Sequence, residues 1–424
     1  METAKEIETA LLFYVEETSK KNVTDNLTAE VLFEELISLA ETAGVEVVET
    51  VHQKLPQINK KHVLGKGKIE EIREIIIERK ISCVISENLL SPAQSNNLAE
   101  LLQIKVVDRA ALILDIFAQR AVSGEGKLQV ELAQLNYLLP KLTGQGAYMS
   151  RLGAGIGTRG PGETKLESDR RHLRRRISVL KNEIKDLHAH KRIQKARREK
   201  NEIPVVALVG YTNSGKSSLL NLIAKENILA EDKLFATLDT TTRMISLDNK
   251  HSFLLSDTVG FIRKLPHQLV EAFKATLEEV CDADLLLHVV DISSNNYLSE
   301  METTEKVLEE LSALGKPIIE VYNKSDLLPQ EVMIAPGKNT RAIISAKTSA
   351  GLDLLLEKIK AILFSEEKLY HFLLPYEESD KLSLFYRQLE IIKTEHEKEG
   401  YLLSGIMKNA ETNPSFAKYI IKEK

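Results

Sequence analysis

Strand-like and helix-like apolar patterns alternate through the first 120 residues of this 424-residue chain. Strand character is found at residues 45–51, 81–86 and 104–107. Apolar residues fall on one helical face at residues 68–79, 91–102 and 108–120. This β-α-β-α order predicts a small parallel sheet, and we assign residues 1–122 to an N-terminal α/β domain. The stretch Gly-Lys-Gly-Lys at residues 65–68 could contact phosphate, but a tight turn before a helix is the favoured interpretation.

Two amphipathic helices are predicted next, over residues 125–143 and 163–200. The second has a narrow apolar seam suited to one partner helix, formed by Leu166, Leu173, Ile177, Leu180, Ile184 and Leu187. The stretch between the helices holds seven of the chain's 20 glycines and cannot pack a core. We therefore expect an antiparallel helical hairpin over residues 123–202, with a Gly-rich loop at residues 143–163 as its mobile tip.

Strands and helices alternate again across residues 203–365, which predicts a doubly wound α/β domain. Residues 366–424 are assigned to a small C-terminal α/β domain with an amphipathic helix near residues 377–396. The expected fold class is therefore multidomain α/β.

Composition excludes several classes of protein. An apolar content of 43% and a charged content of 28% are typical of a globular chain, and no stretch approaches the ~20 apolar residues that span a bilayer. Cys83 and Cys281 lie too far apart in sequence to suggest a disulfide framework or a zinc site, and both are expected to be buried. We expect a cytoplasmic monomer.

The net charge of −5 is unevenly distributed. Residues 170–200 carry 13 Lys and Arg against three acidic residues, a net of +10, which leaves −15 for the rest of the chain. Such asymmetry indicates a polyanionic partner, although a solvated helix face is the usual explanation of a charge run. RNA contacts are expected from Arg151, Arg159, Arg170, Arg171, Arg174, Arg175 and Arg176.

Residues 210–217 read Gly-Tyr-Thr-Asn-Ser-Gly-Lys-Ser, a phosphate-binding loop between an apolar strand and a helix start. Its glycines let backbone N–H groups close around phosphate oxygens. Lys216 can reach the β- and γ-phosphates, and Ser217 can offer its hydroxyl to Mg²⁺. Nucleotide contacts are predicted along the whole loop, from Gly210, Tyr211, Thr212, Asn213, Ser214, Gly215, Lys216, Ser217 and Ser218.

Two later strand ends indicate which nucleotide binds. An apolar strand ends in Asp-x-x-Gly, which places Asp257 to hold Mg²⁺ and Gly260 to reach the γ-phosphate. A second strand ends in Asn-Lys-x-Asp, where the carboxylate of Asp326 can accept two hydrogen bonds from guanine but none from adenine. The sequence therefore predicts GTP rather than ATP, which argues against a helicase. Supporting contacts are expected from Asn323, Lys324, Ser345, Ala346 and Lys347.

Other residues bear on catalysis. A threonine in residues 236–243 could place its hydroxyl on Mg²⁺ only when the γ-phosphate is present; Thr241 and Thr242 both qualify, and Thr242 is favoured. Asn213 could coordinate a monovalent cation or merely brace the loop. Phe261 stands where Ras-like switches carry a water-orienting Gln, so intrinsic hydrolysis should be slow. The predicted catalytic residues are Lys216, Asn213, Thr242 and Gly260.

Taken together, these motifs make the chain resemble the HflX family of GTPases, in the translation-factor-like class. The resemblance spans most of the chain and is most specific at residues 151–167, which read Arg-Leu-Gly-Ala-Gly-Ile-Gly-Thr-Arg-Gly-Pro-Gly-Glu-Thr-Lys-Leu-Glu. It includes residues 237–243, 257–262 and 323–326. Departures are small, with Thr240 in place of Pro and Ser218 in place of Thr.

The resemblance implies a ribosome-associated GTPase that binds the large ribosomal subunit through ribosomal RNA and splits or rescues stalled ribosomes under stress. Its hairpin would point the Gly-rich loop toward the peptidyl-transferase centre. Asn213 matches the family's cation-coordinating Asn, so K⁺ is expected as an activator beside Mg²⁺. The alternative is a GTP-dependent checkpoint factor in ribosome assembly or RNA modification.

Overall fold

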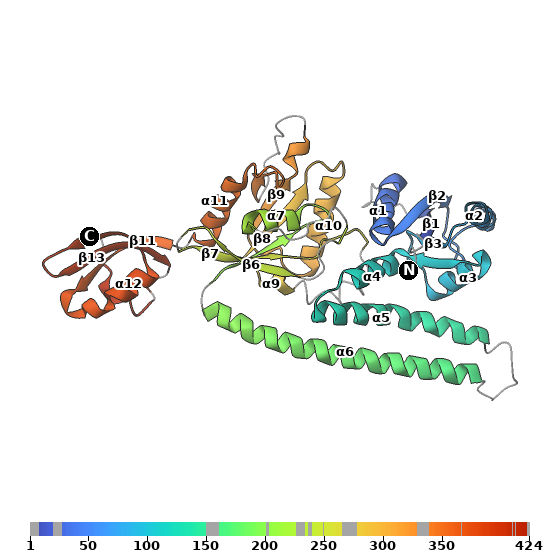
Figure 1. The fold of residues 1–424 in the computed structure, drawn as a ribbon, viewed down its shortest axis with the longest axis horizontal. Helices are drawn as coiled ribbons and strands as arrows, with labels where there is room; N and C mark the ends of the chain where they lie inside the picture. Colours follow the sequence, from blue (N-terminus) through green and yellow to red (C-terminus); the bar gives the residue numbers. More distant parts are fainter. Residues whose placement is uncertain are drawn as a thin grey trace, which may run out of the picture.

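The computed structural model describes residues 8–19, 28–149, 161–200, 203–225, 234–235, 240–248, 250–264, 278–328, 339–365, 367–408, 410–411 and 413–421. Three sheets organise these residues, and Figure 1 shows them in three bodies arranged in a row, with the first and third at opposite ends. The predicted multidomain α/β class is confirmed.

The N-terminal body is a four-stranded parallel sheet in the order β2-β1-β3-β4. Its strands are β1 (Glu8–Glu17), β2 (Val45–Leu55), β3 (Cys83–Ser86) and β4 (Lys105–Asp108), and its helices are α1 (Ala29–Thr42), α2 (Lys66–Arg79), α3 (Pro92–Leu102) and α4 (Arg109–Arg120). Separate apolar clusters fill the two faces of the sheet. The predicted parallel sheet is present, but the sequence patterns missed β1 and α1.

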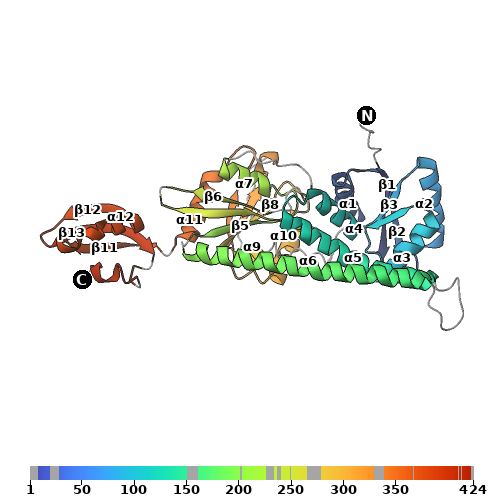
Figure 2. The ribbon, with the colours of Figure 1, turned by 60° about the horizontal axis from the view of Figure 1, so that its bottom comes forward.

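A helical hairpin follows, made of α5 (Gly124–Met149) and α6 (Pro161–Lys200). Leu132 of α5 packs against Ile177 and Leu180 of α6 in a small apolar seam, as the sequence predicted. Figure 2 shows α6 running along the first and second bodies. The predicted start of the Gly-rich loop at residue 143 is wrong, because α5 continues to Met149; residues 150–160 lie outside the described part of the chain.

The central body is a six-stranded sheet in the order β10-β9-β8-β5-β7-β6, parallel except for β6. Its strands are β5 (Val205–Val209), β6 (Thr241–Ser246), β7 (Ser252–Asp257), β8 (Leu285–Asp291), β9 (Ile318–Asn323) and β10 (Thr340–Ile343). Its helices are α7 (Lys216–Ala224), α9 (Glu278–Asp282), α10 (Tyr297–Glu310) and α11 (Leu352–Leu363). The predicted alternation of strands and helices is present. Cys281 of α9 is only half-buried, contrary to expectation, whereas Cys83 is buried.

The C-terminal body is a three-stranded antiparallel sheet of β11 (Glu367–Pro375), β13 (Gly400–Lys408) and β12 (Glu390–His396), in that order. The helix α12 (Leu382–Gln388) packs on it through Phe385, which meets Phe372 and Phe416. The single helix predicted near residues 377–396 is therefore wrong in its second half, which is strand β12. Among the described residues, no helix is long and apolar enough to cross a membrane.

Candidate nucleotide site

The phosphate loop joins β5 to α7, with the helix beginning at Lys216 itself. Gly210 and Gly215 have φ of +148° and +91°, and a Cβ at either position would lie 2.2 Å from the Val289 carbonyl oxygen or the Asn323 amide nitrogen. Only glycine fits such sites. Asn213 is exposed at φ +61°, a conformation that asparagine tolerates. The loop therefore has the glycine-dependent backbone conformation that the motif predicted.

Lys216 is buried and folds over its own loop. Its ammonium donates to the carbonyl oxygens of Gly210 and Tyr211 at 3.1 and 2.7 Å. Burial lowers the pKa of Lys216 to about 8, although the nearby carboxylate of Asp257 opposes the shift. Because the electrostatic attraction between charges is stronger where water is excluded, the buried ammonium of Lys216 can bind an anion strongly.

Ser217 and Asp257 meet beside this lysine. The Ser217 hydroxyl donates to Oδ2 of Asp257 at 2.6 Å, because β7 lies next to β5 and ends at Asp257. A hydroxyl and a carboxylate are hard oxygen donors that suit Mg²⁺, which keeps several of its waters when it binds. The donor set fits the predicted metal.

The Asn-Lys-x-Asp motif, predicted to read guanine, lies at the end of β9. The Asn323 amide donates to the Ser214 carbonyl at 2.9 Å and accepts from the Ala346 N–H at 2.9 Å. The Ser345 hydroxyl donates to Oδ1 of Asp326 at 2.6 Å. Asn323 therefore connects the phosphate loop, through Ser214, with the segment that follows β10, through Ala346. Next to Asn323, the ammonium of Lys324 forms an ion pair with Asp291 at 2.7 Å, and Lys347 is exposed.

The segment after Asp257 is docked on the phosphate loop. The Phe261 N–H donates to the Gly210 carbonyl at 3.0 Å, and the Thr212 N–H donates to the Phe261 carbonyl at 2.8 Å. A Cβ on Gly260 would lie 2.8 Å from the Thr212 Cα and 2.9 Å from the Lys216 nitrogen. The backbone of Gly260 therefore lies so close to the phosphate loop that no side chain would fit at this position.

The two candidate threonines lie on opposite faces of the sheet. In the antiparallel pair β6–β7, Thr241 is opposite Asp257 and Thr242 is opposite Ser256. Directly paired residues share a face, so Thr241 shares that of Asp257. The hydroxyl of Thr242 instead lies 3.2 Å from the Ser256 hydroxyl. The register therefore places Thr241, and not Thr242, on the face of Asp257; the preference for Thr242 as a metal ligand stays a prediction, and residues 236–239 lie outside the described residues.

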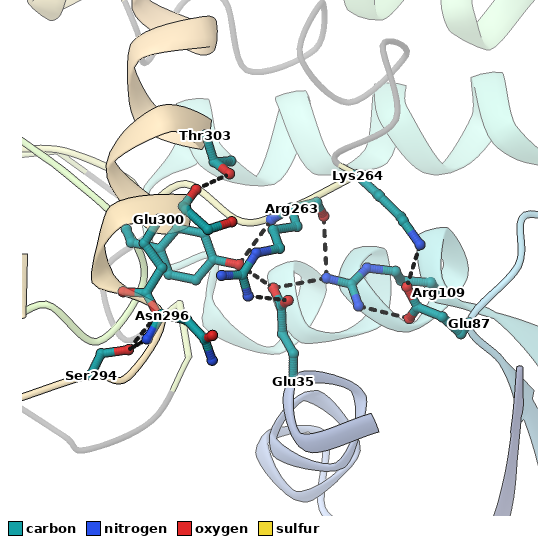
Figure 3. A network of polar contacts seen from close by, with 11 residues as sticks. Glu35, Glu87, Arg109, Arg263, Lys264, Ser294, Asn296, Glu300 and Thr303 are labelled. Carbon is teal, nitrogen blue, oxygen red and sulfur yellow. Dashed lines mark hydrogen bonds and ion pairs between the residues drawn. The ribbon is translucent and has the colours of Figure 1, made fainter. Parts of the chain in front are cut away.

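A buried ionic network joins the N-terminal body to this site (Figure 3). Arg109, only 1% exposed, donates to Glu87 at 2.8 Å and to Glu35 at 2.9 Å, and its Nη2 reaches the Arg263 carbonyl at 3.2 Å. The Tyr211 hydroxyl donates to Glu35 and accepts from the Arg263 N–H at 3.0 Å.

Burial and the Glu35 carboxylate raise the pKa of Tyr211 well above its ordinary value. Lys264 adds an ion pair to Glu87 at 3.3 Å. Thus the phosphate loop, through Tyr211, and the segment after Gly260 both contact the N-terminal body. Sequence reasoning missed this network, because its acidic members belong to no motif. The one available signal was charged residues such as Glu35 on the otherwise apolar face of a helix.

The basic arm is the cluster of arginines at positions 170, 171, 174, 175 and 176 of α6. Part of its charge is paired within the hairpin. Arg176 makes two hydrogen bonds of 2.7 Å to Glu131 of α5. Arg171, Arg174 and Arg175 are exposed, and Arg170 is half-buried. Arg151 and Arg159 fall outside the described residues. The exposed arginines keep their charge available to a partner.

The chain is similar to known protein families along its length. Three family models match along the chain, one described as GTP-binding GTPase N-terminal over residues 30–118, one as GTP-binding GTPase Middle Region over residues 120–198, and one as 50S ribosome-binding GTPase over residues 205–324. A solved GTP-binding protein from Sulfolobus solfataricus in complex with GDP is 28% identical, with 84% of this chain and 99% of that chain covered and a TM-score of 0.43.

Several relatives carry the name GTPase HflX. The protein from Caldanaerobacter subterraneus is 52% identical, covering 86% of this chain and 85% of its own length. That from Lacrimispora saccharolytica is 45% identical over 95% and 94%, and that from Escherichia coli K12 is 41% identical over 93% and 92%. Identity of this level along nearly the whole of both chains shows the family. The chain therefore belongs to the HflX family of GTPases.

Proposed function

We propose that this GTPase binds the large ribosomal subunit and splits or rescues stalled ribosomes under stress, with the basic arm of α6 contacting ribosomal RNA. The observation that carries the proposal is the exposure of Arg171, Arg174 and Arg175 on a helix whose apolar seam is turned toward α5. Side chains held in this way can neutralise RNA phosphates without giving up the packing of the hairpin. The description of the matching family model as a 50S ribosome-binding GTPase supports the choice of subunit.

Each side chain of the nucleotide site has a role in the proposed hydrolysis of GTP to GDP and phosphate. Lys216 exchanges the carbonyls of Gly210 and Tyr211 for phosphate oxygens, where its buried charge interacts strongly. Ser217 and Asp257 would hold Mg²⁺, which neutralises charge between the β- and γ-phosphates when bound. Asp326, oriented by the Ser345 hydroxyl, accepts from the guanine edge.

A monovalent cation completes the proposed site. Asn213 is exposed at the rim of the phosphate loop, where its side-chain oxygen can coordinate K⁺ beside the phosphates. Phe261 stands where Ras-like GTPases carry a glutamine that orients the attacking water. Its side chain is 3% exposed and has no polar group, so it cannot take over that role. Positive charge from K⁺, and a further contribution from the ribosome, would offset that deficiency.

Cosedimentation tests the ribosomal proposal. The full-length protein, loaded with a non-hydrolysable GTP analogue, should pellet with large subunits and not with small subunits. Replacing Arg171, Arg174 and Arg175 by Glu should abolish pelleting in moderate salt while leaving GTP affinity unchanged. A matched control reverses three exposed cations elsewhere, Lys306, Arg387 and Lys398, and should pellet normally. Equal pelleting of both triple variants would contradict an RNA-binding role for the arm.

The alternative function is a GTP-dependent checkpoint in ribosome assembly or RNA modification. The two are separated by offering complete ribosomes with an occupied peptidyl site. A splitting factor releases free subunits from them on addition of GTP, which light scattering records. A checkpoint factor binds immature large subunits in preference and leaves complete ribosomes intact.

A further inference from the structure

One buried carboxylate of the N-terminal body holds three segments of the chain together. Asp108, which is 1% exposed, ends β4 and caps α4 by accepting a hydrogen bond from the Ala111 N–H at 3.0 Å. It also accepts from the Leu90 N–H, in the loop after β3, at 3.3 Å. Two of the segments that Asp108 joins therefore belong to the N-terminal body itself.

The third segment is α5, the first helix of the hairpin. The Tyr137 hydroxyl donates to Oδ1 of Asp108 at 2.5 Å, and the Lys141 ammonium, one turn later, donates to Oδ2 at 3.4 Å. The same ammonium lies 4.0 Å from the centroid of the Tyr137 ring and donates to its hydroxyl. Each oxygen of Asp108 thus accepts two hydrogen bonds, which is all that a carboxylate can accept.

The position of Tyr137 in the sequence explains why a hydroxyl reaches this place. Val130, Ala133 and Tyr137 recur at spacings of three and four along α5 and pack against the apolar core of the N-terminal body. A phenylalanine would satisfy that packing, so the hydroxyl adds the bond to Asp108. Burial, together with the carboxylate of Asp108, raises the pKa of Tyr137 well above its ordinary value, so the hydroxyl keeps its proton and remains a donor.

Contacts within the hairpin carry the direction of α5 over to the basic arm. Leu132 of α5 packs against Ile177 and Leu180 of α6, and Figure 2 shows the two helices side by side. The two hydrogen bonds between Glu131 and Arg176 add a polar connection between the same helices. Because helices are stiff, the angle at which α5 leaves Asp108 sets where the exposed arginines of α6 lie.

We infer that Asp108 is a positioning residue for ribosome binding, which fixes through Tyr137 and Lys141 the direction in which the hairpin leaves the N-terminal body. Asp108 touches no RNA itself. The inference rests on the proposed function, in which the basic arm meets ribosomal RNA. Arginines that are held in one orientation before contact lose less conformational entropy on binding, so an anchored arm binds more tightly than a swinging one.

Two substitutions loosen the anchor without removing the buried carboxylate. Tyr137→Phe keeps the ring in the apolar core and deletes only the hydroxyl, and Lys141→Met keeps most of the side-chain length and deletes the charge. The matched control is Tyr386→Phe, at a tyrosine of α12 that is 53% exposed and whose hydroxyl lies 3.2 Å from that of Thr394.

The direction of the hairpin is measured on the full-length protein without ribosomes. Spin labels at Glu74→Cys, on α2, and Ser168→Cys, on α6, report the distance between the N-terminal body and the arm; both positions are exposed. The half-buried Cys281 is replaced by Ser so that it takes no label. The wild type and Tyr386→Phe should give one narrow distance distribution, and Tyr137→Phe and Lys141→Met should broaden it.

The consequence for binding is measured by cosedimentation with large subunits, on proteins without labels. Tyr137→Phe should weaken pelleting roughly tenfold in moderate salt, because apparent affinity falls with the fraction of molecules that hold the arm in the binding direction. Its affinity for GTP should match that of the wild type. A general loss of folding would lower both affinities, so the pair of measurements separates positioning from mere destabilisation.

An unchanged distance distribution in Tyr137→Phe and Lys141→Met would overturn the anchor. Broadening without weaker pelleting, or weaker pelleting with an equal loss of GTP affinity, would remove its role in ribosome binding. If Tyr137→Phe does not fold, Lys141→Met carries the same decision. A wild-type protein that does not pellet with large subunits would contradict the proposed function instead, while the distance measurement would still decide whether Asp108 fixes the hairpin.

Discussion

The Arg109 guanidinium donates a hydrogen bond to the backbone carbonyl of Arg263 at 3.2 Å, which joins the first turn of α4 to the segment just beyond Gly260. Burial disfavours the charge on Arg109, but the carboxylates of Glu87 and Glu35 outweigh it and raise the pKa of Arg109 above its ordinary value. A buried cation destabilises a protein unless carboxylates or other acceptors surround it. The contact with Arg263 therefore couples the stability of the N-terminal body to its packing against the segment beside the nucleotide site.

Arg109→Ala should therefore destabilise the protein by about 3–5 kcal/mol, since it leaves Glu87, which is 2% exposed, and Glu35, which is 9% exposed, without their shared partner. The midpoint of urea unfolding of the full chain measures the effect. Arg73→Ala, at an exposed position of α2, should change stability by about 0.5 kcal/mol or less. A similar shift in both variants would mean that the network contributes no net stability.

His288 of β8 should make the protein less stable in acid. Burial lowers the pKa of His288 to about 4, against the attraction of Glu320 and with a further push from Lys216. The unfolded chain, with a histidine pKa of about 6.5, binds this proton more readily, so stability is full above pH ~6.5 and falls as pH drops toward 4. The loss should approach about 3 kcal/mol.

The measurement is the difference in unfolding free energy between wild type and His288→Gln as a function of pH. The difference should vary between pH 6.5 and about 4 and stay constant above. Exposed His396, on β12, supplies the control His396→Gln, whose profile should run parallel to that of the wild type. If the unfolding free energy of His288→Gln instead ran parallel to that of the wild type at every pH, His288 would have the same pKa in the folded and unfolded states.

Asp326→Asn should move nucleotide preference from guanine toward xanthine, because an amide can donate where the carboxylate accepts and xanthine offers a carbonyl in place of the amine. Competition between GTP and XTP for a fluorescent nucleotide measures it. Asp326 is exposed in the structure, so the base itself would cover it, and we expect a loss of GTP affinity of roughly a hundredfold or more once the amide is mispaired with the guanine edge. Asp353→Asn, at an exposed carboxylate of α11, is the control. Unchanged GTP affinity would remove Asp326 from base reading.

Replacing K⁺ by Na⁺ should slow ribosome-stimulated hydrolysis, and Asn213→Ala should abolish the difference between the two ions. The expected reason is that Na⁺ is smaller and leaves the Asn213 oxygen and the phosphates badly spaced around it. Phosphate release at constant ionic strength provides the rate. Equal rates in both salts for the wild type would discard the cation and leave Asn213 as a residue that braces the loop.

Local pattern was sufficient where the chemistry is local. The phosphate loop could be identified because Gly210 and Gly215 need backbone conformations and space that only glycine provides, and because strand and helix lie directly beside it in sequence. Asn323 and Asp326 lie within one short motif at the end of a strand, so the motif was identifiable from sequence, whereas their contacts with Ser214 and Ser345 were not predicted. The hairpin seam at Ile177 and Leu180 was equally legible from helical spacing.

Pattern failed where pairing partners are remote. Residues 390–396 look compatible with a helix, but they form β12 because β13 offers a strand to pair with. β1 is an apolar run buried at the centre of its sheet, and such a run has no periodicity to distinguish strand from helix.

By itself, the sequence determined the family, the preference for guanine and the identity of the loop residues, since each depends on residue types within a few positions of one another. Only the tertiary structure shows that Thr241, and not Thr242, shares the face of Asp257, because this depends on how β6 pairs with another strand. It also decided the partners of Arg109, whose charge acquires a role only when a segment 154 residues away is folded against it. Long-range electrostatics depends on proximity in space, and proximity is what folding alone provides.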